Sequence, residues 1–363
     1  MFTALLVVGI LVFLIVIHEL GHFVAAKIFR VRVEEFGVGY PPRAFRFGKI
    51  GDTEYTLNWI PFGGFVRLFG DIGEEEHGAG SFVDARRVIQ ALILIAGEAA
   101  NALAAWALFA AALHAGIPRP VAAPVPGEEA RLIVYAVISG SPADAAGIES
   151  GDEIRFVSDA RGERVSELTP VAVSEFVAAH GGEALAVTYS RARETATAEV
   201  TPAHAVIAES ADRPALGVAL VLVSAESLPW SVAAREAIAV TQGSFVTVAR
   251  KLWGILAQAF SGAPDLSGVM GPVGLIGVVN EAAQAGLGRV LALAAFISVN
   301  LAIINLVPIP ALDGGRLALL GVEVIMGRKA PRLLLQTLNV LGVALIIFLM
   351  VAITFYDVSK LLT

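Results

Sequence analysis

The sequence predicts an α-helical polytopic membrane protein, with four core transmembrane helices and an α+β domain inserted outside the cytoplasm. Of its 363 residues, 56% are hydrophobic and only 16% are charged, which is not the composition of a soluble globular protein. Four apolar stretches are at least as long as the roughly 20 residues that a spanning helix needs. A polar segment with short β-type runs separates the second stretch from the third.

Charge and cysteine content narrow the possible functions. The net charge is −7 and no basic block stands out, so we expect no nucleic acid partner. The chain has no Cys, which excludes disulfides, thiolate metal ligands and a Cys nucleophile. Any metal must therefore be held by His and carboxylate side chains.

The first predicted span covers residues 1–29 and carries His18, Glu19 and His22 near one end. It has no basic start and no small-residue cleavage site, so we interpret it as a retained helix and not as a signal peptide. The other three spans are predicted at 88–117, 289–315 and 333–363.

Basic residues predict the orientation of the spans. Arg and Lys gather in the connecting segments 30–87 and 316–332, which should therefore be cytoplasmic. Residues 118–288 and both termini should then lie outside the cytoplasm.

Residues 118–204 are predicted to form a folded domain with several short strands and one helix. Thr169 as N-cap and Pro170 at the first helical position indicate where this helix begins. The linker 205–288 follows, and within it residues 229–260 have apolar side chains at helical spacing, interrupted by charges. We interpret this stretch as an amphipathic helix on the membrane surface or against the bundle, in preference to a fifth span.

The most informative motif is HELGH at residues 18–22. Side chains four apart lie on one helix face, so His18 and His22 can bind one zinc ion while Glu19 activates the metal-bound water. The alternatives are a chance match or core histidines satisfied by hydrogen bonds. Ionisable groups inside an apolar span are costly unless they are paired or bound to metal, which favours a metal site.

Two His ligands need a further protein ligand, and the clearest candidate is Asp313 in NLVPIPALDGG, residues 305–315. The prolines break the helix and the glycines allow a tight turn after the carboxylate. Irregular backbone at membrane depth needs protein or water around it. The alternative is a turn that ends the helix and carries a solvated Asp.

Together these two motifs resemble the site-2 protease family of intramembrane zinc metalloproteases, and in particular its bacterial regulator-of-sigma-E-type members. The resemblance implies Zn²⁺ held by His18, His22 and Asp313, with Glu19 as the general base. It also implies that Asn305, Pro308 and Pro310 help to hold a substrate that is itself a transmembrane helix.

Two further segments extend the resemblance. PFGGFVRL, residues 61–68, looks like the family's membrane-dipping hairpin, and MGPVG, residues 270–274, resembles its Gly-Pro segment. An apolar edge containing Phe62, Gly63, Gly64 and Phe65 could add an unwound substrate as another strand. The alternative is a tight turn that merely anchors the hairpin.

SPADAAGI at 141–148, followed by GDEI at 151–154, is similar to the PDZ domains that these bacterial proteases carry. A PDZ domain at 118–204 implies a groove for a peptide or for a substrate's periplasmic segment. Glu128 and Glu129 precede the first strand and would repel a peptide carboxylate. A filter against substrates with intact outer domains fits at least as well.

One motif departs from the family. The family usually has Gly-Pro-x-x-Asn in the second span, whereas this chain has GEAAN at 97–101. Glu98, with Asn101, could support a zinc-bound His, hold a proton or be an additional ligand. Alternatively, Glu98 extends toward the membrane surface or hydrogen-bonds between helices.

These observations favour a protease of the bacterial inner membrane that cleaves single-span membrane proteins within the lipid. The family suggests trimmed anti-sigma factors or remnant signal peptides as substrates. A catalytically inactive PDZ adaptor would not need Glu19. A metal transporter would need polar residues spaced through all four spans, which the sequence lacks.

Overall fold

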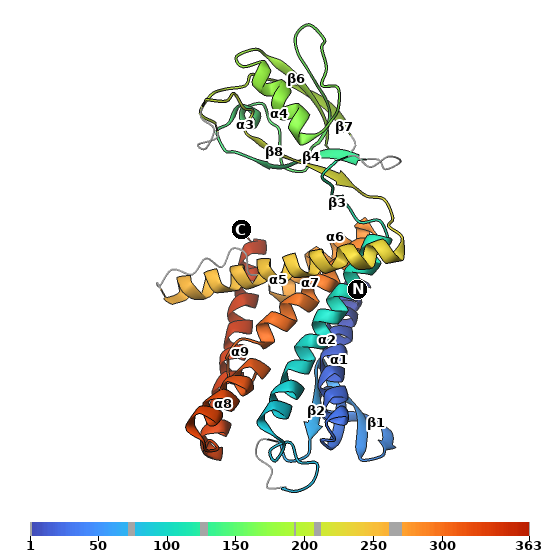
Figure 1. The fold of residues 1–363 in the computed structure, drawn as a ribbon, viewed down its shortest axis with the longest axis vertical. Coiled ribbons are helices and arrows are strands. Elements are labelled where there is room, and N and C mark those ends of the chain that lie inside the picture. Colours follow the sequence, from blue (N-terminus) through green and yellow to red (C-terminus); the bar gives the residue numbers. More distant parts are fainter. Residues whose placement is uncertain are drawn as a thin grey trace. The chain divides into compact units, whose positions relative to one another are not determined.

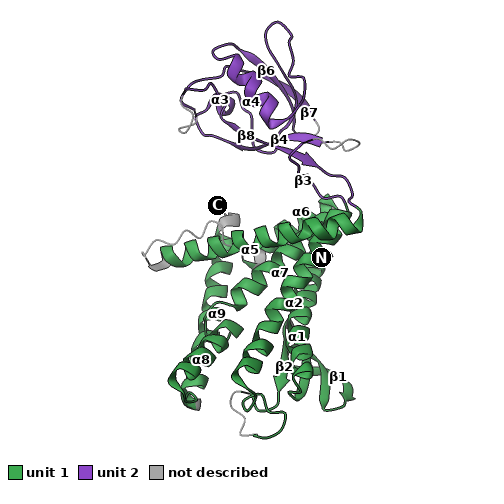
Figure 2. Cartoon of the chain, viewed as in Figure 1, with its two compact units in different colours: residues 1–115, 229–363 green, residues 116–228 purple. Residues whose placement is uncertain are grey.

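The computed structural model describes residues 2–71, 77–123, 130–191, 194–206, 212–260 and 271–362. Glu128, Glu129 and Met270 lie outside the described residues. The chain divides into two compact units, Met1–Ala115 with Pro229–Thr363 and Gly116–Leu228 (Figure 2).

The first unit is a helical bundle with a long β-hairpin. Among the described residues, four helices are long and apolar enough to cross a membrane, and they lie in the four predicted stretches. These helices are α1 (Phe2–Ile28), α2 (Arg87–His114), α7 (Leu287–Asn305) and α9 (Arg332–Leu362). Small residues let the helices approach closely, as they do in membrane proteins generally. A Cβ on Gly21 of α1, for instance, would overlap the Ala96 carbonyl oxygen of α2.

The third span ends earlier than predicted. Helix α7 stops at Asn305, and a second helix, α8 (Asp313–Met326), begins at the Asp of the LDGG motif. The predicted span 289–315 is therefore broken, and most of the predicted loop 316–332 is helical. Pro308 and Pro310 explain the break, because neither has the N–H that would continue α7.

The hairpin consists of β1 (Val33–Ile50) and β2 (Thr53–Leu68), which pair from Val33 opposite Leu68 to Ile50 opposite Thr53 with several shifts of register. Residues 35–38 of β1 have partners in two stretches of β2, 64–67 and 54–57. Its base is held by a buried apolar cluster that joins it to α1 and α2. The cluster consists of Ala25, Ala26, Val31, Val33, Leu68, Phe82, Ile93 and Leu94. This packing fixes β2 beside the HELGH end of α1.

Two helices follow the second unit. Helix α5 (Trp230–Phe260) is not among the candidate spans, in agreement with the preference for an amphipathic helix, and α6 is Pro272–Ala285. Helix α5 lies across α2 and α7 (Figure 1). Trp106 of α2 donates its indole N–H to the Ala234 carbonyl at 2.8 Å, and His114 stacks on Trp230 with ring centres 4.2 Å apart.

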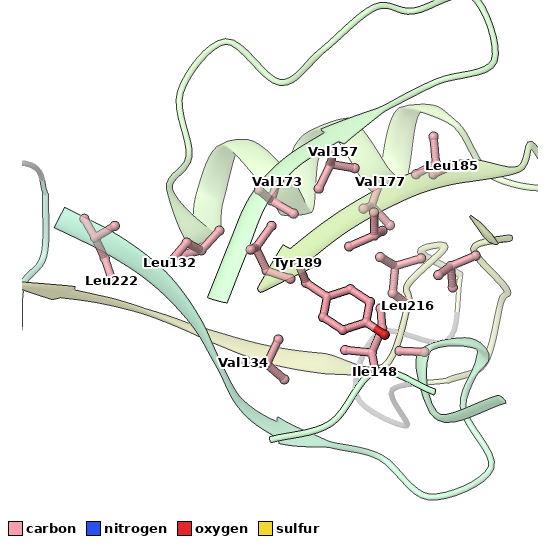
Figure 3. Close-up of a cluster of buried hydrophobic side chains, with 14 residues drawn as sticks. Leu132, Val134, Ile148, Val157, Val173, Val177, Leu185, Tyr189, Leu216 and Leu222 are labelled. Carbon is pink, nitrogen blue, oxygen red and sulfur yellow. The ribbon is translucent and has the colours of Figure 1, made fainter. Parts of the chain in front are cut away.

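In its described residues, the second unit is a six-stranded sheet of order β3-β8-β4-β5-β6-β7 with two helices. Its elements are β3 (Arg119–Pro120), β4 (Ala130–Val137), α3 (Pro142–Ala145), β5 (Glu153–Ser158), α4 (Pro170–Ala179), β6 (Leu185–Arg191), β7 (Glu194–Val200) and β8 (Val218–Ser224). Thr169 caps α4 as predicted, since its hydroxyl accepts the N–H of Ala172. The apolar face of α4 and the inner face of the sheet form one core around Val134, Val157 and Leu185 (Figure 3).

The predicted end of this domain at residue 204 is too early. Strand β8 pairs with β4 along its whole length, from Val218 opposite Val137 to Ser224 opposite Ala130. Leu216 and Leu222 belong to the buried core. The compact unit therefore extends to Leu228, and the predicted linker 205–288 begins inside it.

Candidate metal centre

Three side chains from two distant helices meet within the first unit. His18 and His22 lie one turn apart on α1, and Asp313 is the first residue of α8. Asp313 Oδ2 is 3.1 Å from His18 Nε2 and 3.3 Å from His22 Nε2, and the two Nε2 atoms are 3.2 Å apart. Both histidines are 8% exposed.

These distances suit a metal ion. The potential ligand atoms of His18, His22 and Asp313 all lie within 4.8 Å of one another. Tetrahedral zinc with bonds of about 2.0 Å keeps its ligand atoms about 3.3 Å apart. Two imidazoles and one carboxylate are also the donor set of many catalytic zinc sites, in which a fourth position stays open for water.

Helix α2 orients the two imidazoles. The carbonyl oxygen of Ile93 lies 2.8 Å from His22 Nδ1, so His22 donates its Nδ1–H there and keeps the Nε2 lone pair for a metal. Asn101 Nδ2 lies 3.4 Å from His18 Nδ1. A Cβ on Gly97 would lie 2.5 Å from His22 Nε2, so no larger residue fits there without displacing the imidazole.

The turn before α8 positions Asp313. Residues 306–312 are not α-helical, and Ala311 has a φ of 79°. Gly314 and Gly315 are buried beneath this turn, where a Cβ on either would overlap the carbonyl groups of Leu306 or Ile309. The LDGG glycines thus let the start of α8 pack directly against the turn that delivers the carboxylate.

Glu19 lies between the histidines and the hairpin. The backbone of Val66 in β2 lies close enough to interact with its carboxyl group. A Cβ on Gly64 would lie 3.0 Å from Glu19 Cγ, so the strand runs directly against this side chain. Gly63, with a φ of 132°, packs still more closely on the ring of Tyr40.

The remaining predicted substrate-binding residues lie on both sides of this cluster. Asn305 Nδ2 is 3.4 Å from His18 Nε2, while Pro308 and Pro310 lie in the turn before α8. Phe65 belongs to β2 and borders a cavity of about 590 Å³ in the hairpin. The side chain of Phe62 lies outside the described part of the chain.

Glu98 is buried in α2 and is only 4% exposed, so it does not extend toward the membrane surface. Within the described residues, neither of its carboxylate oxygens has a hydrogen-bond partner, so these residues give no support to the alternative of a hydrogen bond between helices. Asn101 is fully buried, and its backbone carbonyl accepts the Ser298 hydroxyl of α7 at 2.8 Å.

Sequence reasoning missed the contributions of Ile93 and Gly97. Residues 93, 97 and 101 are spaced by four and therefore share one face of α2. That spacing was visible in the sequence, but it could not indicate that the face is turned toward the histidines.

A second group of potential ligands, Asp159, Glu163 and His180, lies in the second unit. The carboxylate of Asp159 accepts the backbone N–H groups of Arg161 and Glu163 at 3.0 and 2.7 Å. This hydrogen bonding is that of a side chain stabilising a turn, so we assign the group no metal.

A HExxH helix and a distant carboxylate that meet inside an apolar helix bundle define the class of membrane zinc metalloproteases. The chain belongs to peptidase family M50, the site-2 protease family, whose model matches residues 6–349. It is accordingly a zinc-dependent endopeptidase. This assignment favours the enzyme over the PDZ adaptor and the metal transporter that the sequence left open.

Named relatives support the same class over nearly the whole chain. The chain is 31% identical to the putative zinc metalloprotease CPE1693 of Clostridium perfringens, over 95% of each protein. It is 27% identical to the zinc metalloprotease RasP of Shouchella clausii, over 99% of each. It is also 30% identical to the chloroplastic membrane metalloprotease ARASP of Arabidopsis thaliana, over 94% of this chain and 75% of that protein.

We predict that Gly97→Ala reduces zinc binding at least tenfold, because the added methyl group would push the His22 imidazole out of place. The measurement is zinc per chain in purified protein at limiting zinc. Gly243→Ala on α5 is the control, since a Cβ there meets nothing within 4 Å. Equal zinc content in both variants and the wild type would show that α2 does not constrain the imidazoles.

Proposed function

We propose that His18, His22 and Asp313 hold the zinc ion and that Glu19 is the general base of an intramembrane endopeptidase. The observation that carries this proposal is that His18 Nε2, His22 Nε2 and Asp313 Oδ2 meet, although Asp313 lies 295 residues after His18. The three distances between these atoms are all between 3.1 and 3.3 Å. The donor types and spacings fit catalytic zinc.

When bound, zinc lowers the pKa of a bound water and polarises the substrate carbonyl. Glu19 takes the proton of the attacking water and returns it to the leaving amine nitrogen. Gly64 of β2 packs against Glu19 and limits the movement of its side chain during both transfers. The Ile93 carbonyl keeps the His22 imidazole in one tautomer, so that its Nε2 remains free for the metal.

The substrate is proposed to bind as an extended segment along β2. A peptide bond within a helix is shielded by its own turns, so a transmembrane substrate must unwind before water can reach it. Strand addition at Gly63, Gly64 and Phe65 would replace the hydrogen bonds lost on unwinding. The closeness of Gly64 to Glu19 supports this position, with Phe62 extending the same edge.

On the opposite side, Asn305, Pro308 and Pro310 are proposed to hold the substrate near the ligands. The amide of Asn305 is close enough to His18 to donate to a carbonyl placed at the cluster. The two prolines have no N–H to compete for substrate carbonyls.

We further propose a bacterial inner-membrane location and single-span membrane proteins as substrates, such as trimmed anti-sigma factors or remnant signal peptides. The basic segments 30–87 and 316–332 favour a cytoplasmic position for the hairpin end of the bundle. The start of α1 and the end of α9 both lie at the opposite end of the bundle (Figure 1), which supports both termini being outside.

For the second unit we propose a PDZ domain, with a peptide-binding or size-filter role. Its support is a cavity of about 270 Å³ between α4 and β8, lined by side chains such as Val173, Val177 and Leu216. An extended peptide or the outer segment of a substrate could lie there as an added strand.

We predict that Glu19→Gln lowers the cleavage rate by about 10²–10⁴-fold, the contribution of a general base, with zinc still bound. The measurement is cleavage of a model single-span substrate in liposomes, together with zinc content. Glu183→Gln, an exposed change in the second unit, is the control. Chelator should abolish cleavage by wild type, and added zinc should restore it. Full activity of Glu19→Gln would end the proposed mechanism.

If the second unit is a size filter, replacing residues 117–227 by a short Gly-Ser linker should permit cleavage of substrates that keep a folded outer domain. Trimmed substrates should be cleaved at the wild-type rate, because the bundle holds the catalytic residues. Parallel assays of both substrate forms would test this. An unchanged preference for trimmed substrates would remove the filter hypothesis.

A further inference from the structure

Glu98 is a buried ionisable side chain that the mechanism does not use. Glu98 is 4% exposed, and both of its carboxylate oxygens lack a hydrogen-bond partner among the described residues. The same is true of Asn101 Oδ1, one turn further along α2. Burying a carboxylate without hydrogen bonds or a positive charge is strongly unfavourable. A helix that retains such a group needs a compensating interaction.

The surroundings of Glu98 place it beside the metal ligands but outside their set. The Asp313 carboxylate repels its carboxyl group, whereas His18 and His22 attract it. The preceding residue, Gly97, packs against both imidazoles. Among the described groups whose ligand atoms meet within 4.8 Å, however, Glu98 does not appear. It can therefore act on a bound ion through its charge and not as a ligand.

Among the described residues, no basic side chain compensates Glu98. Within the described residues, no Arg or Lys forms an ion pair with Glu98, although such pairs bind many other carboxylates in the bundle, for example Glu323 with Arg87. Two neutral imidazoles and the Asp313 carboxylate leave one positive charge on bound Zn²⁺, and Glu98 faces that charge together with the carboxylate of Glu19. In a low-dielectric interior, a nearby carboxylate interacts strongly with that charge.

We propose that Glu98 is a buried counter-charge for the zinc ion, which strengthens metal binding without entering the ligand set. This inference rests on the proposed ligands His18, His22 and Asp313. It gives a role to Glu98, which stands where the family's Gly-Pro-x-x-Asn element usually has Pro. Glu98 is thus a positioning residue for the metal and has no part in the proton transfers of Glu19.

The test is the zinc affinity of full-length protein in detergent, measured by competition with a chelator. Glu98→Gln keeps the shape and removes the charge, and we expect it to bind zinc about 10–100-fold more weakly, the usual effect of losing a residue that supports a metal ligand. Glu281→Gln, an exposed change on α6, is the matched control and should bind zinc as wild type does. An affinity of Glu98→Gln within twofold of wild type would overturn the inference.

Melting temperatures separate this role from a structural one. In metal-free protein the charge of Glu98 has no ion to face, so Glu98→Gln should melt no lower than wild type. The rise in melting temperature on adding zinc should be smaller for Glu98→Gln than for wild type. An equal loss of melting temperature with and without zinc would mean that Glu98 serves packing, and would also overturn the inference.

A third variant distinguishes the two proposals. His22→Ala should lose zinc binding altogether if the proposed ligand set is right. If His22→Ala keeps wild-type affinity, the ligand set itself is wrong. If His22→Ala loses zinc while Glu98→Gln keeps wild-type affinity, the ligand set stands and only the inference about Glu98 fails.

Discussion

The central physical constraint on this chain is that two imidazoles and a carboxylate must meet inside an apolar bundle. Each group alone would be costly at membrane depth, and together they form a site for one cation. His18 and His22 are brought together by a single turn of α1. Asp313 reaches them only because α7 ends at Asn305 and the chain turns before α8 begins.

Close backbone contacts make that meeting possible. Gly21 lets α1 and α2 touch, Gly97 leaves room for the imidazoles, and Gly314 with Gly315 lets α8 begin directly beneath the turn. On α9, Gly342 packs against the carbonyl of Pro310 and so supports the same turn from another helix. These glycines act by lacking a Cβ where the chain meets a neighbouring backbone or, at Gly97, the two imidazoles. The hairpin uses Gly64 in the same way against the side chain of Glu19.

Much of this architecture could be predicted from the sequence, because hydrophobic length and the HELGH spacing are local signals. The four apolar helices, the cap of α4 by Thr169 and the zinc metalloprotease class all belong to this group. Proximity between distant segments was not predictable in the same way. That β8 completes the sheet, that α8 follows the turn and that the Ile93 carbonyl orients His22 all depend on tertiary pairing. The sequence likewise could not show that the Glu98 carboxylate has no hydrogen-bond partner among the described residues, because this depends on the residues packed around it.

The most direct test of the central claim is zinc K-edge X-ray absorption on the purified protein. The account predicts a four-coordinate site with nitrogen and oxygen donors at about 2.0–2.1 Å, including the scattering of two imidazoles. If the His18→Ala variant still binds some zinc, its spectrum should show scattering from one imidazole instead of two. A wild-type spectrum without imidazole scattering would contradict the account. So would a His18→Ala spectrum identical to that of the wild type.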